Sequence, residues 1–448
     1  MNNQPTSKNE PPAIVKNYLH KYGLSSWSLI FAGQKKFNNV VVVPAIEESE
    51  NVKRLLTSLT RNDKQYFDES LFLFVVNNLE SSELTVKLDN LNTLDFLRGI
   101  IGKDLRTPDT KTLIDSGINI GIVDASSEGH EMPEKDGGVG LARKIGMDLA
   151  LTILDYNSNR KKILICLDAD CTVENNYLTS IVEAVNSKNI SAAYVHYEHK
   201  LPDEPKHKLA IICYEIFLRY YLLGLIHAGS PFAFPTIGST MICDYESYIK
   251  VGGMNKKKAA EDFYFMEKLG KITRIEKIGS TKVYPSSRPS WRVPFGTGQR
   301  VNRFLQEAHD EYVLYDPESF DVLKKWTEIF NAEEILGADE YLLRAKEIDR
   351  AMHKFLIQNS FAENWNKILQ SSKSEEQTWK QKLMWFDGFR TLKLIHFLRD
   401  NGYPLVNMFD AIDKLFAMIS KDSKIARSDL IPSAEIQIEY LKHFRRLT

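Results

Sequence analysis

The stretch that decides the fold is "KKILICLDADCTVENNYL", residues 161 to 178. Five mostly apolar residues, Ile163 to Leu167, lead directly into Asp168-Ala169-Asp170. Such a run is typical of a strand buried on both faces, and a turn after it could bring both carboxylates toward one point. Hard cations such as Mg²⁺ and Mn²⁺ prefer carboxylate oxygens and keep substrate phosphates as further ligands. The stretch alone leaves two interpretations open, a metal and diphosphate site or an aspartate that caps the next helix.

Strand-like and helix-like segments alternate around this stretch. Apolar runs predict strands at residues 38–45, 70–78, 118–126 and 162–170, with segments of helical spacing between them. This alternation is typical of an α/β sheet with mostly parallel strands. In such sheets, ligands bind beyond the carboxyl ends of the strands. Polar residues stand at those ends and can converge on one crevice: Glu47, Glu48, Asn77, Asn78, Asp124, Asp168 and Asp170.

A glycine-rich segment, "DGGVGLARKIGMD" at residues 136–148, opens a strong helical pattern. Gly138 and Gly140 stand at the helix start, where exposed N–H groups and the helix dipole can hold phosphate. Arg143 lies one turn further, where a cation can meet an anionic ligand. A plain glycine turn before a helix explains the same residues, so both interpretations stay open. A Rossmann cofactor site is disfavoured, because the last glycine of the dinucleotide fingerprint is absent and the preceding strand is distant.

Two adjacent acids, Glu261 and Asp262, fall in a predicted helix over residues 259–269 and precede aromatic residues. A carboxyl group beside apolar walls can acquire a proton affinity suited to a general base. Adjacent acids on a helix also occur as solvated surface, so the pair alone does not decide. The segment 282–304 is rich in Pro, Ser, Gly and Arg and predicts a loop, whose Arg288 and Arg292 could grip a diphosphate.

The composition narrows the class of protein. The chain has 448 residues, 43% of them hydrophobic and 26% charged, and its net charge of -1 gives no argument for binding nucleic acid. The 4 cysteines form no CxxC pair, and we expect buried thiols in a reducing cytoplasm. The polar N-terminus does not resemble a signal peptide. The apolar run at 209–228 contains Glu215, Arg219 and His227, which favours a buried helix over a membrane span and leaves at most a peripheral membrane contact open.

The pattern changes along the chain and predicts three regions. Residues 1–37 form a tail with a short helix. Residues 38–300 form the α/β domain, with halves at 38–187 and 188–300. Residues 301–448 show long helical segments without strand-like alternation, which predicts an all-α C-terminal domain.

The order of these motifs resembles that of the family 2 glycosyltransferases, which have the GT-A fold. "VVVVPAIEESENVKRLLTSL" is similar to their first strand and helix, and "LFLFVVNN" to their second strand. "GGVGLARKIGMD" resembles their Gly-x-x-x-Ala-Arg-Asn helix, and "ICLDADCTVENNYL" their DxD strand. "AAEDFYFMEKLGK" resembles the acceptor-side segment in which a Glu-Asp pair opens a helix. The likeness covers roughly residues 38–300 and makes 38–187 the donor-binding half and 188–300 the acceptor half.

The resemblance implies a soluble glycosyltransferase that moves a sugar from a nucleoside-diphosphate sugar to an acceptor hydroxyl. It makes Asp262 the general base of an inverting reaction and gives Glu261 the orientation of the acceptor. It places Mn²⁺ or Mg²⁺ on Asp168 and Asp170. The nucleotide-sugar-binding candidates, from the resemblance and from the motifs above, are Pro44, Ala45, Glu47, Asn77, Asn78, Gly138, Gly140, Arg143, Asp168, Ala169, Arg288 and Arg292.

The sequence departs from the family pattern at the ends of the first two strands. Ile46 and Glu47 replace the usual Tyr and Asn, and Asn77 and Asn78 replace aspartates, one of which usually reads the uracil imide. Asparagine can both accept and donate a hydrogen bond, so a UDP- or GDP-linked donor stays open. The acceptor is expected to be a saccharide, a small molecule or a lipid-linked molecule, and a homodimer and a retaining outcome stay open. A sugar-phosphate nucleotidyltransferase and a non-catalytic nucleotide-sugar-binding protein are the alternative functions.

Overall fold

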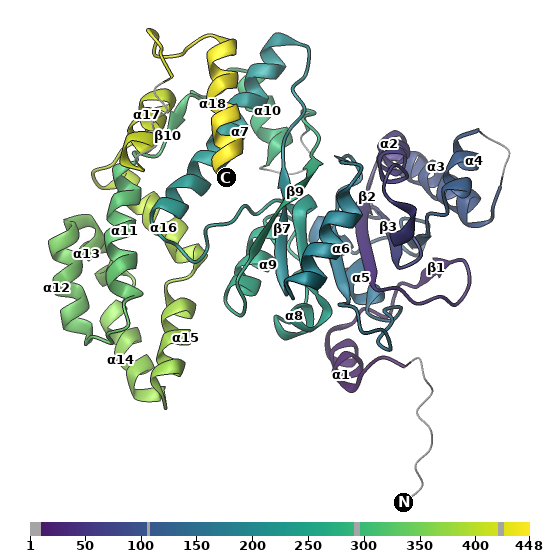
Figure 1. The fold of residues 1–448 in the computed structure, drawn as a ribbon, viewed down its shortest axis with the longest axis horizontal. Helices are drawn as coiled ribbons and strands as arrows, with labels where there is room; N and C mark the ends of the chain where they lie inside the picture. Colours follow the sequence, from purple (N-terminus) through teal and green to yellow (C-terminus); the bar gives the residue numbers. More distant parts are fainter. Residues whose placement is uncertain (1–9, 105–107, 291–295, 420–424) are drawn as a thin grey trace, which may run out of the picture. The chain divides into compact units, whose positions relative to one another are not determined.

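The computed structural model describes residues 10–104, 108–290, 296–419 and 425–448 (Figure 1). It is a mixed α/β structure with a large, mainly parallel sheet flanked by helices and a helical C-terminal part, as the sequence predicts. The chain forms two compact units. The sheet unit contains the residues up to Lys200 and Thr236–Ser286, and the helical unit contains Leu201–Pro235 and Gly296–Thr448.

The sheet unit is built on a nine-stranded sheet with the order β1-β4-β3-β2-β5-β8-β7-β9-β6. Strands β2 to β5 run parallel to their neighbours among themselves, and β7 and β9 form another parallel pair. Strand β8 runs antiparallel to both β5 and β7. The strands are β1 (Leu29–Phe31), β2 (Asn39–Ala45), β3 (Ser70–Asn77), β4 (Ile120–Ala125), β5 (Ile163–Cys166), β6 (Thr172–Val173), β7 (Ala192–Tyr197), β8 (Met241–Asp244) and β9 (Glu276–Tyr284).

Helices cover both faces of this sheet. One face carries Val41 and Val43 of β2 and shares an apolar core with residues of α2, α3 and α6. The other face carries Val42, against which α5 packs so closely that a Cβ at Gly146 would lie 2.4 Å from a Val42 methyl group. Burial on both faces explains the unbroken apolar runs. The helices are α1 (Ala13–Tyr22), α2 (Ser49–Leu59), η1 (Lys64–Tyr66), α3 (Leu84–Ile101), α4 (Pro108–Ser116), α5 (Val139–Ala150), α6 (Tyr177–Ser187), η2 (Gly238–Thr240), α8 (Tyr245–Lys250) and α9 (Glu261–Gly270).

The helical unit is built around α7 (Pro205–His227), which packs against α10, α11 and α18. Its core is rich in aromatic side chains, including the fully buried Trp326 and Trp365. A short two-stranded sheet pairs β10 (Val313–Leu314) with β11 (Val406–Asn407). The other helices are α10 (Thr297–Leu305), α11 (Glu318–Phe330), α12 (Ala338–Ile348), α13 (Arg350–Gln358), α14 (Phe361–Ser371), α15 (Glu375–Trp385), α16 (Gly388–Asp400), α17 (Met408–Met418) and α18 (Ala434–Leu447).

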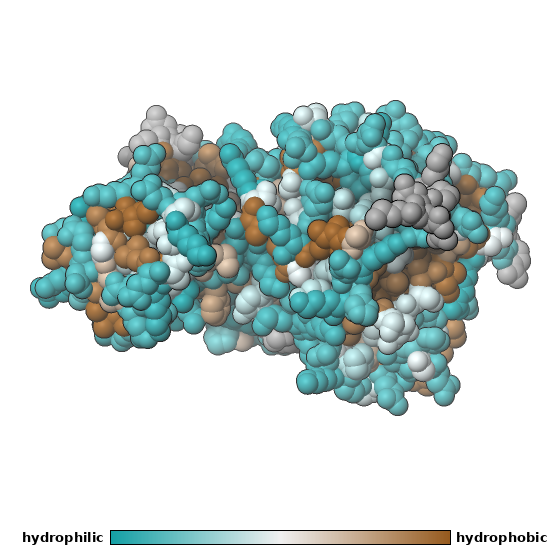
Figure 2. Space-filling view, turned by 90° about the horizontal axis from the view of Figure 1, so that it is seen from below, coloured by the Kyte–Doolittle hydropathy of each residue, from teal (hydrophilic) through white to brown (hydrophobic). Residues whose placement is uncertain are grey.

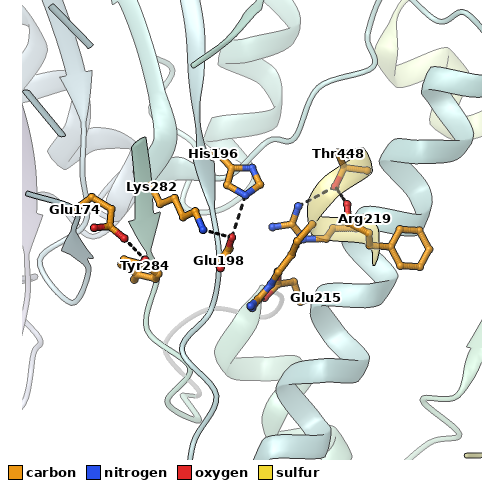
Figure 3. Close-up of polar contacts among 10 residues, drawn as sticks. Glu174, His196, Glu198, Glu215, Arg219, Lys282, Tyr284 and Thr448 are labelled. Atoms are coloured by element: carbon orange, nitrogen blue, oxygen red, sulfur yellow. Dashed lines mark hydrogen bonds and ion pairs between the residues drawn. The ribbon is translucent and has the colours of Figure 1, made fainter. Parts of the chain in front are cut away.

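Helix α7 carries charges that are paired inside the helical unit (Figure 3). The Glu215 carboxylate is 0% exposed and accepts hydrogen bonds from Arg219 at 2.8 Å and from Arg445 of α18 at 2.7 and 2.8 Å. Among the described residues, α7 is the one helix long and apolar enough to cross a membrane, yet 67% of its most apolar window is buried within the protein. The core helix of a soluble protein has the same properties, which agrees with the buried helix expected from the sequence.

Apolar side chains also remain on the surface. The face in Figure 2 is mostly hydrophilic, with hydrophobic side chains gathered in separate patches. On α3, Leu84, Leu88 and Leu91 are 70%, 52% and 46% exposed, and their spacing places them along one side of the helix.

Two segments differ from the sequence expectations. Residues 29–31, assigned to a tail, form β1, which is the outermost strand next to β4 and pairs with Gly121–Val123. The segment 282–304, predicted as a loop, contains the last residues of β9 and most of α10. Tertiary contacts outweigh local composition here, because Val301 of α10 is fully buried against Ala210 and Ile211 of α7.

Helix α7 lies within the helical unit, where it packs with C-terminal helices. The sequence of α7 gives no indication of its partner, since its apolar residues surround the whole helix.

Candidate active site

The polar residues expected at the strand ends share one edge of the sheet. Strands β2, β3 and β5 are parallel, so the residues that follow them lie at the same edge. Because β8 is antiparallel to β5, the start of β8 and the preceding turn η2 lie there too. Asp168 and Asp170 follow β5 at this edge, and both side chains are half-buried. Carboxylate side chains and backbone groups from several elements therefore lie at this one edge of the sheet.

Arg143 of α5 is the centre of this site. Its side chain is 3% exposed, and its guanidinium donates hydrogen bonds to the carboxylates of Asp168 and Glu261. One arginine thus joins the residues after β5 to the start of α9. Its Nε is buried and has no hydrogen-bond partner within the described part of the chain. A Cβ at Gly238 would lie 2.2 Å from its Nη2, so glycine in η2 leaves the space that the guanidinium occupies.

The start of α9 is held by close backbone contacts. Ala260, the residue before the helix, has a φ of 58°, the left-handed conformation that places α9 after a sharp turn. The side chain of Asn255 donates to the Glu261 carbonyl at 2.9 Å. A Cβ at Gly140 would lie 2.3 Å from the carbonyl oxygen of Lys257, so this glycine lets α5 approach the segment 255–261. Gly140 therefore serves the packing of α5 against the catalytic candidates.

The pKa values of this group are shifted from their usual ranges. Burial raises the pKa of Asp262 to about 7, and the charge on Glu261 adds to the effect. Burial also raises the pKa of Glu261, against the opposing charge of Arg143. Burial disfavours the charge on Arg143, but Asp168 and Glu261 outweigh it and raise the pKa of Arg143. A carboxyl group that titrates near neutral pH is suited to accept a proton.

The ends of β2 and β3 are joined by Asn90 of α3, a residue that lies outside the sequence motifs. Asn90 is 0% exposed, and its Nδ2 donates to the Asn77 carbonyl at 3.0 Å and to the Asn78 Oδ1 at 2.8 Å. Its Oδ1 accepts the backbone N–H of Glu47 at 2.9 Å, where Glu47 has a φ of 55°. The available signal was an asparagine inside a helix, where this residue is unfavourable unless its side chain has another role.

The side chains of Asn77 and Asn78 are used within the fold. Both are buried, at 3% and 0% exposure. The Nδ2 of Asn77 donates to the carbonyls of Ala45 and Val75 at 3.1 and 3.0 Å, and that of Asn78 donates to the Leu79 carbonyl at 3.0 Å. Their amide donors therefore hold the strand ends in place.

The remaining candidates are spread along the same elements. Pro44 is half-buried, and Glu47 is exposed beyond the end of β2. Gly138 is the residue before α5, and Ala169, 2% exposed, separates the two aspartates. Arg288 is half-buried in the helical unit. Arg292 lies outside the described residues.

A second polar cluster lies at the ends of β6, β7 and β9 (Figure 3). Glu198 pairs with Lys282 at 2.6 Å and lies 3.3 Å from the His196 ring, and the Tyr284 hydroxyl donates to Glu174. Strands β5 and β7 are both antiparallel to β8, so the end of β7, and with it the cluster, lies at the same edge of the sheet as Asp168 and Asp170. A cavity of about 260 Å³ adjoins it, lined by Glu174, Asn175, Asn176, Gly279, Ser280, Thr281 and Lys282. Alternating polar residues in "VHYEHK" are the sequence signal for this cluster.

The residues of this site suit a divalent cation whose remaining ligands come from the substrate. Among the described residues, no group of three His, Cys, Asp or Glu side chains could hold a metal ion. Asp168 and Asp170 offer two carboxylates at the sheet edge, and the Asp168 side chain remains 33% exposed beside Arg143. Mg²⁺ is commonly bound by one or two carboxylates with water and substrate phosphates as the other ligands. The donor set therefore suits a metal that arrives with a diphosphate.

No protein-family model and no curated protein sequence matches the chain. Structures that align with it include S. aureus TarS 1-349 in complex with UDP-GlcNAc, with 14% identity, a TM-score of 0.37 and coverage of 87% of this chain and 94% of that chain. Another is the mannosyltransferase PcManGT from Pyrobaculum calidifontis in complex with GDP-Man and Mn²⁺, with 12% identity, a TM-score of 0.37 and coverage of 83% and 92%. TM-scores of 0.37 are too low to assign a function to this chain from these alignments.

Proposed function

We propose that this chain is a glycosyltransferase that moves a sugar from a nucleoside-diphosphate sugar to an acceptor hydroxyl, with inversion at the anomeric carbon. The arrangement around Arg143 supports the proposal most. This buried arginine binds Asp168, after the DxD strand, and Glu261, the neighbour of a carboxyl group whose pKa is raised to about 7. A candidate diphosphate site and a candidate base are thereby joined through one side chain.

In this proposal Asp262 is the general base. Its carboxylate takes the proton of the acceptor hydroxyl while the hydroxyl oxygen forms a bond to the anomeric carbon. The bond between that carbon and the diphosphate oxygen breaks, and the nucleoside diphosphate leaves with the electron pair. Glu261 orients the acceptor, and Arg143 holds Glu261 and Asp168 in place as a positioning residue. A base that titrates near neutral pH is half ionised where most enzymes work.

The donor would lie along the carboxyl ends of the strands. Arg143 is buried, so it would hold Asp168 rather than cover the nucleotide. The base and ribose would meet the backbone and side chains after β2 and β3, and the diphosphate would meet the region of α5 and the DxD motif. The proposed contacts are Pro44, Ala45, Glu47, Asn77, Asn78, Gly138, Gly140, Asp168, Ala169, Arg288 and Arg292.

Asp168 and Asp170 would hold Mn²⁺ or Mg²⁺ together with the donor diphosphate. The cation supplies Lewis-acid stabilisation of the charge on the leaving diphosphate when it is bound. Asp170 is the expected direct ligand, as the resemblance to the family 2 glycosyltransferases implies, and the Asp168 carboxylate also accepts a hydrogen bond from Arg143.

A thermal-shift panel of UDP, GDP and their sugars, each with and without Mn²⁺, tests the proposal on the intact chain. A ligand stabilises the folded state that binds it, so the matching nucleotide should raise Tm by several degrees, and more so with Mn²⁺. In Asp170→Asn the gain due to Mn²⁺ should disappear while the fold survives.

Donor hydrolysis is measured in parallel as the turnover readout. A full Mn²⁺-dependent shift in Asp170→Asn would remove this residue from the metal site. No shift and no hydrolysis with any donor would contradict the proposed function.

The acceptor class, a cytoplasmic location and a homodimer remain part of the proposal, with a saccharide, a small molecule or a lipid-linked molecule as acceptor.

A further inference from the structure

Helix α1 packs against α5 directly beside Arg143. Tyr18 of α1 is 4% exposed, and its hydroxyl donates to the Asp148 carboxylate at 2.9 Å. Lys144, the residue after Arg143, donates to the same carboxylate at 2.7 Å and to the Tyr18 hydroxyl at 3.2 Å. Tyr248 of α8 is a further donor to Asp148, at 2.7 Å. Asp148 is 2% exposed, and a buried carboxylate is costly without such donors.

The same tyrosine contacts the segment that leads to the candidate base. Gly253 has a φ of 73°, and a Cβ there would lie 1.9 Å from the Tyr18 hydroxyl oxygen and 3.1 Å from that of Tyr248. Tyr248 also makes a hydrogen bond with the backbone of Met254. One residue further, Asn255 donates to the Glu261 carbonyl at 2.9 Å. A continuous series of contacts therefore runs from α1 to the start of α9.

We propose that Tyr18 is a positioning residue for the candidate catalytic segment, residues 253–261. Helix α1 then contributes to the site and is not only part of a terminal tail. Tyr18 reaches the site by two routes. Through Asp148 and Lys144 it fixes the side of α5 next to Arg143, and through Gly253 it fixes the start of the segment 253–261. Loss of its hydroxyl withdraws a donor from Asp148 and leaves a gap against the glycine. Both routes converge on the carboxyl groups of α9, and the kinetic part of this inference rests on the proposed function.

Hydrogen exchange of the full-length chain tests the positional claim without any substrate. Tyr18→Phe should make the backbone amides of residues 253–263 exchange at least about five times faster, because their anchoring contacts weaken. Tyr22→Phe is the matched control, since it removes a hydroxyl from the same helix at a side chain that is 43% exposed. It should leave that segment unchanged. In the transfer assay, Tyr18→Phe should lower kcat roughly tenfold with donor KM within about twofold.

Several outcomes would overturn the inference. These are unchanged exchange at 253–263, an increase spread evenly over the sheet unit, and a local increase with unchanged kcat. If the wild-type chain turns over no donor, the proposed function fails, and the exchange pattern still decides the positional claim. If Tyr18→Phe does not fold, Tyr248→Phe removes another donor from the same carboxylate, and the same local increase is expected.

Discussion

At the scale of single residues, Asp262 joins two opposed properties. Burial beside Glu261 raises the pKa of Asp262 to about 7, which suits a base but makes its ionised form unfavourable in the folded protein. An ionised carboxylate usually stabilises a fold through its hydrogen bonds and ion pairs. Ionisation of Asp262 instead lowers the free energy of unfolding, because its pKa is raised in the folded state. The expected activity and the expected stability of the chain therefore depend on the same carboxyl group in opposite directions.

Replacing Asp262 with asparagine should lower kcat at least about 100-fold and leave donor binding within about threefold, because general base catalysis is lost and the shape is kept. In the wild-type chain, kcat should rise with pH and level off above a pKa near 7, since the base must be ionised. Steady-state rates from pH 5.5 to 9 measure both effects. Unchanged turnover in Asp262→Asn, or a flat pH profile, would remove Asp262 from this role.

The same substitution should stabilise the protein at alkaline pH. The pKa of Asp262 is about 7 in the folded state, above about 3.9 in an unfolded chain, so the folded state binds more protons between these values. The free energy of unfolding therefore falls as pH rises from about 4 to about 7 and is level above that. Asp262→Asn should be more stable than wild type by roughly 2–4 kcal/mol at pH 8, with a smaller difference at pH 5. Urea titrations at the two pH values measure it, and an equal difference at both would contradict the raised pKa.

At the scale of elements, the site depends on places where backbone meets side chain without space for a methyl group. In η2, a Cβ at Gly238 would lie 2.2 Å from the Arg143 guanidinium. Gly238→Ala should push the guanidinium from its carboxylates, lowering kcat/KM at least tenfold and costing about 1–3 kcal/mol of stability. Gly279→Ala is the matched control, since the nearest atom to its Cβ would be a Lys277 side-chain carbon at 3.6 Å.

Gly279→Ala should change stability by less than about 0.5 kcal/mol and leave turnover intact. Turnover and urea unfolding of both variants decide the matter. Equal turnover and equal stability of the two variants would show that the close contact between Gly238 and Arg143 does not affect function.

The local sequence predicted most strands of the sheet, but it predicted few of the long-range contacts that connect the strands and helices at the site. Strands such as Val40–Val43 are unbroken β-branched runs, because both of their faces are covered, and so they were readable from the sequence. The bond from Arg143 to Glu261 spans 118 positions, and no periodicity carries that information. Tyr18 and Asn90 were missed for the same reason, since each acts through residues distant in the chain. Strand β1 and helix α10 depend on packing partners that outweigh their composition.

At the scale of the whole molecule, the chain leaves the sheet unit after Lys200, builds α7, and returns at Thr236 to complete the sheet. The helical unit should unfold as a body of its own that depends on the Glu215 ion pairs. Glu215→Ala leaves Arg219 and Arg445 without their buried carboxylate, and loss of one partner from such a group costs about 3–5 kcal/mol. Differential scanning calorimetry should show this loss in one transition.

Glu363→Ala provides the matched control within the same unit. Its pair with Lys367 is solvent-exposed on both sides, at 66% and 68%, and water and salt screen such pairs so that they contribute little to stability. A Glu215→Ala variant as stable as Glu363→Ala would mean that the buried charges do not hold α7 in place.

The pairing of α7 with α18 has a consequence for how the chain is made. Glu215 and Arg445 are separated by 230 positions, so the helix emerges from the ribosome long before its partner exists. At roughly 5–20 residues per second, this delay lasts on the order of 10–50 seconds. During that time α7, an apolar helix with a carboxylate at its centre, lacks the α18 arginine that pairs with Glu215, although the last strand of the sheet, β9, has already been made. Protein made without a holding chaperone, or cut short before α18, is therefore expected to aggregate through α7 even though every strand of the sheet has been synthesised.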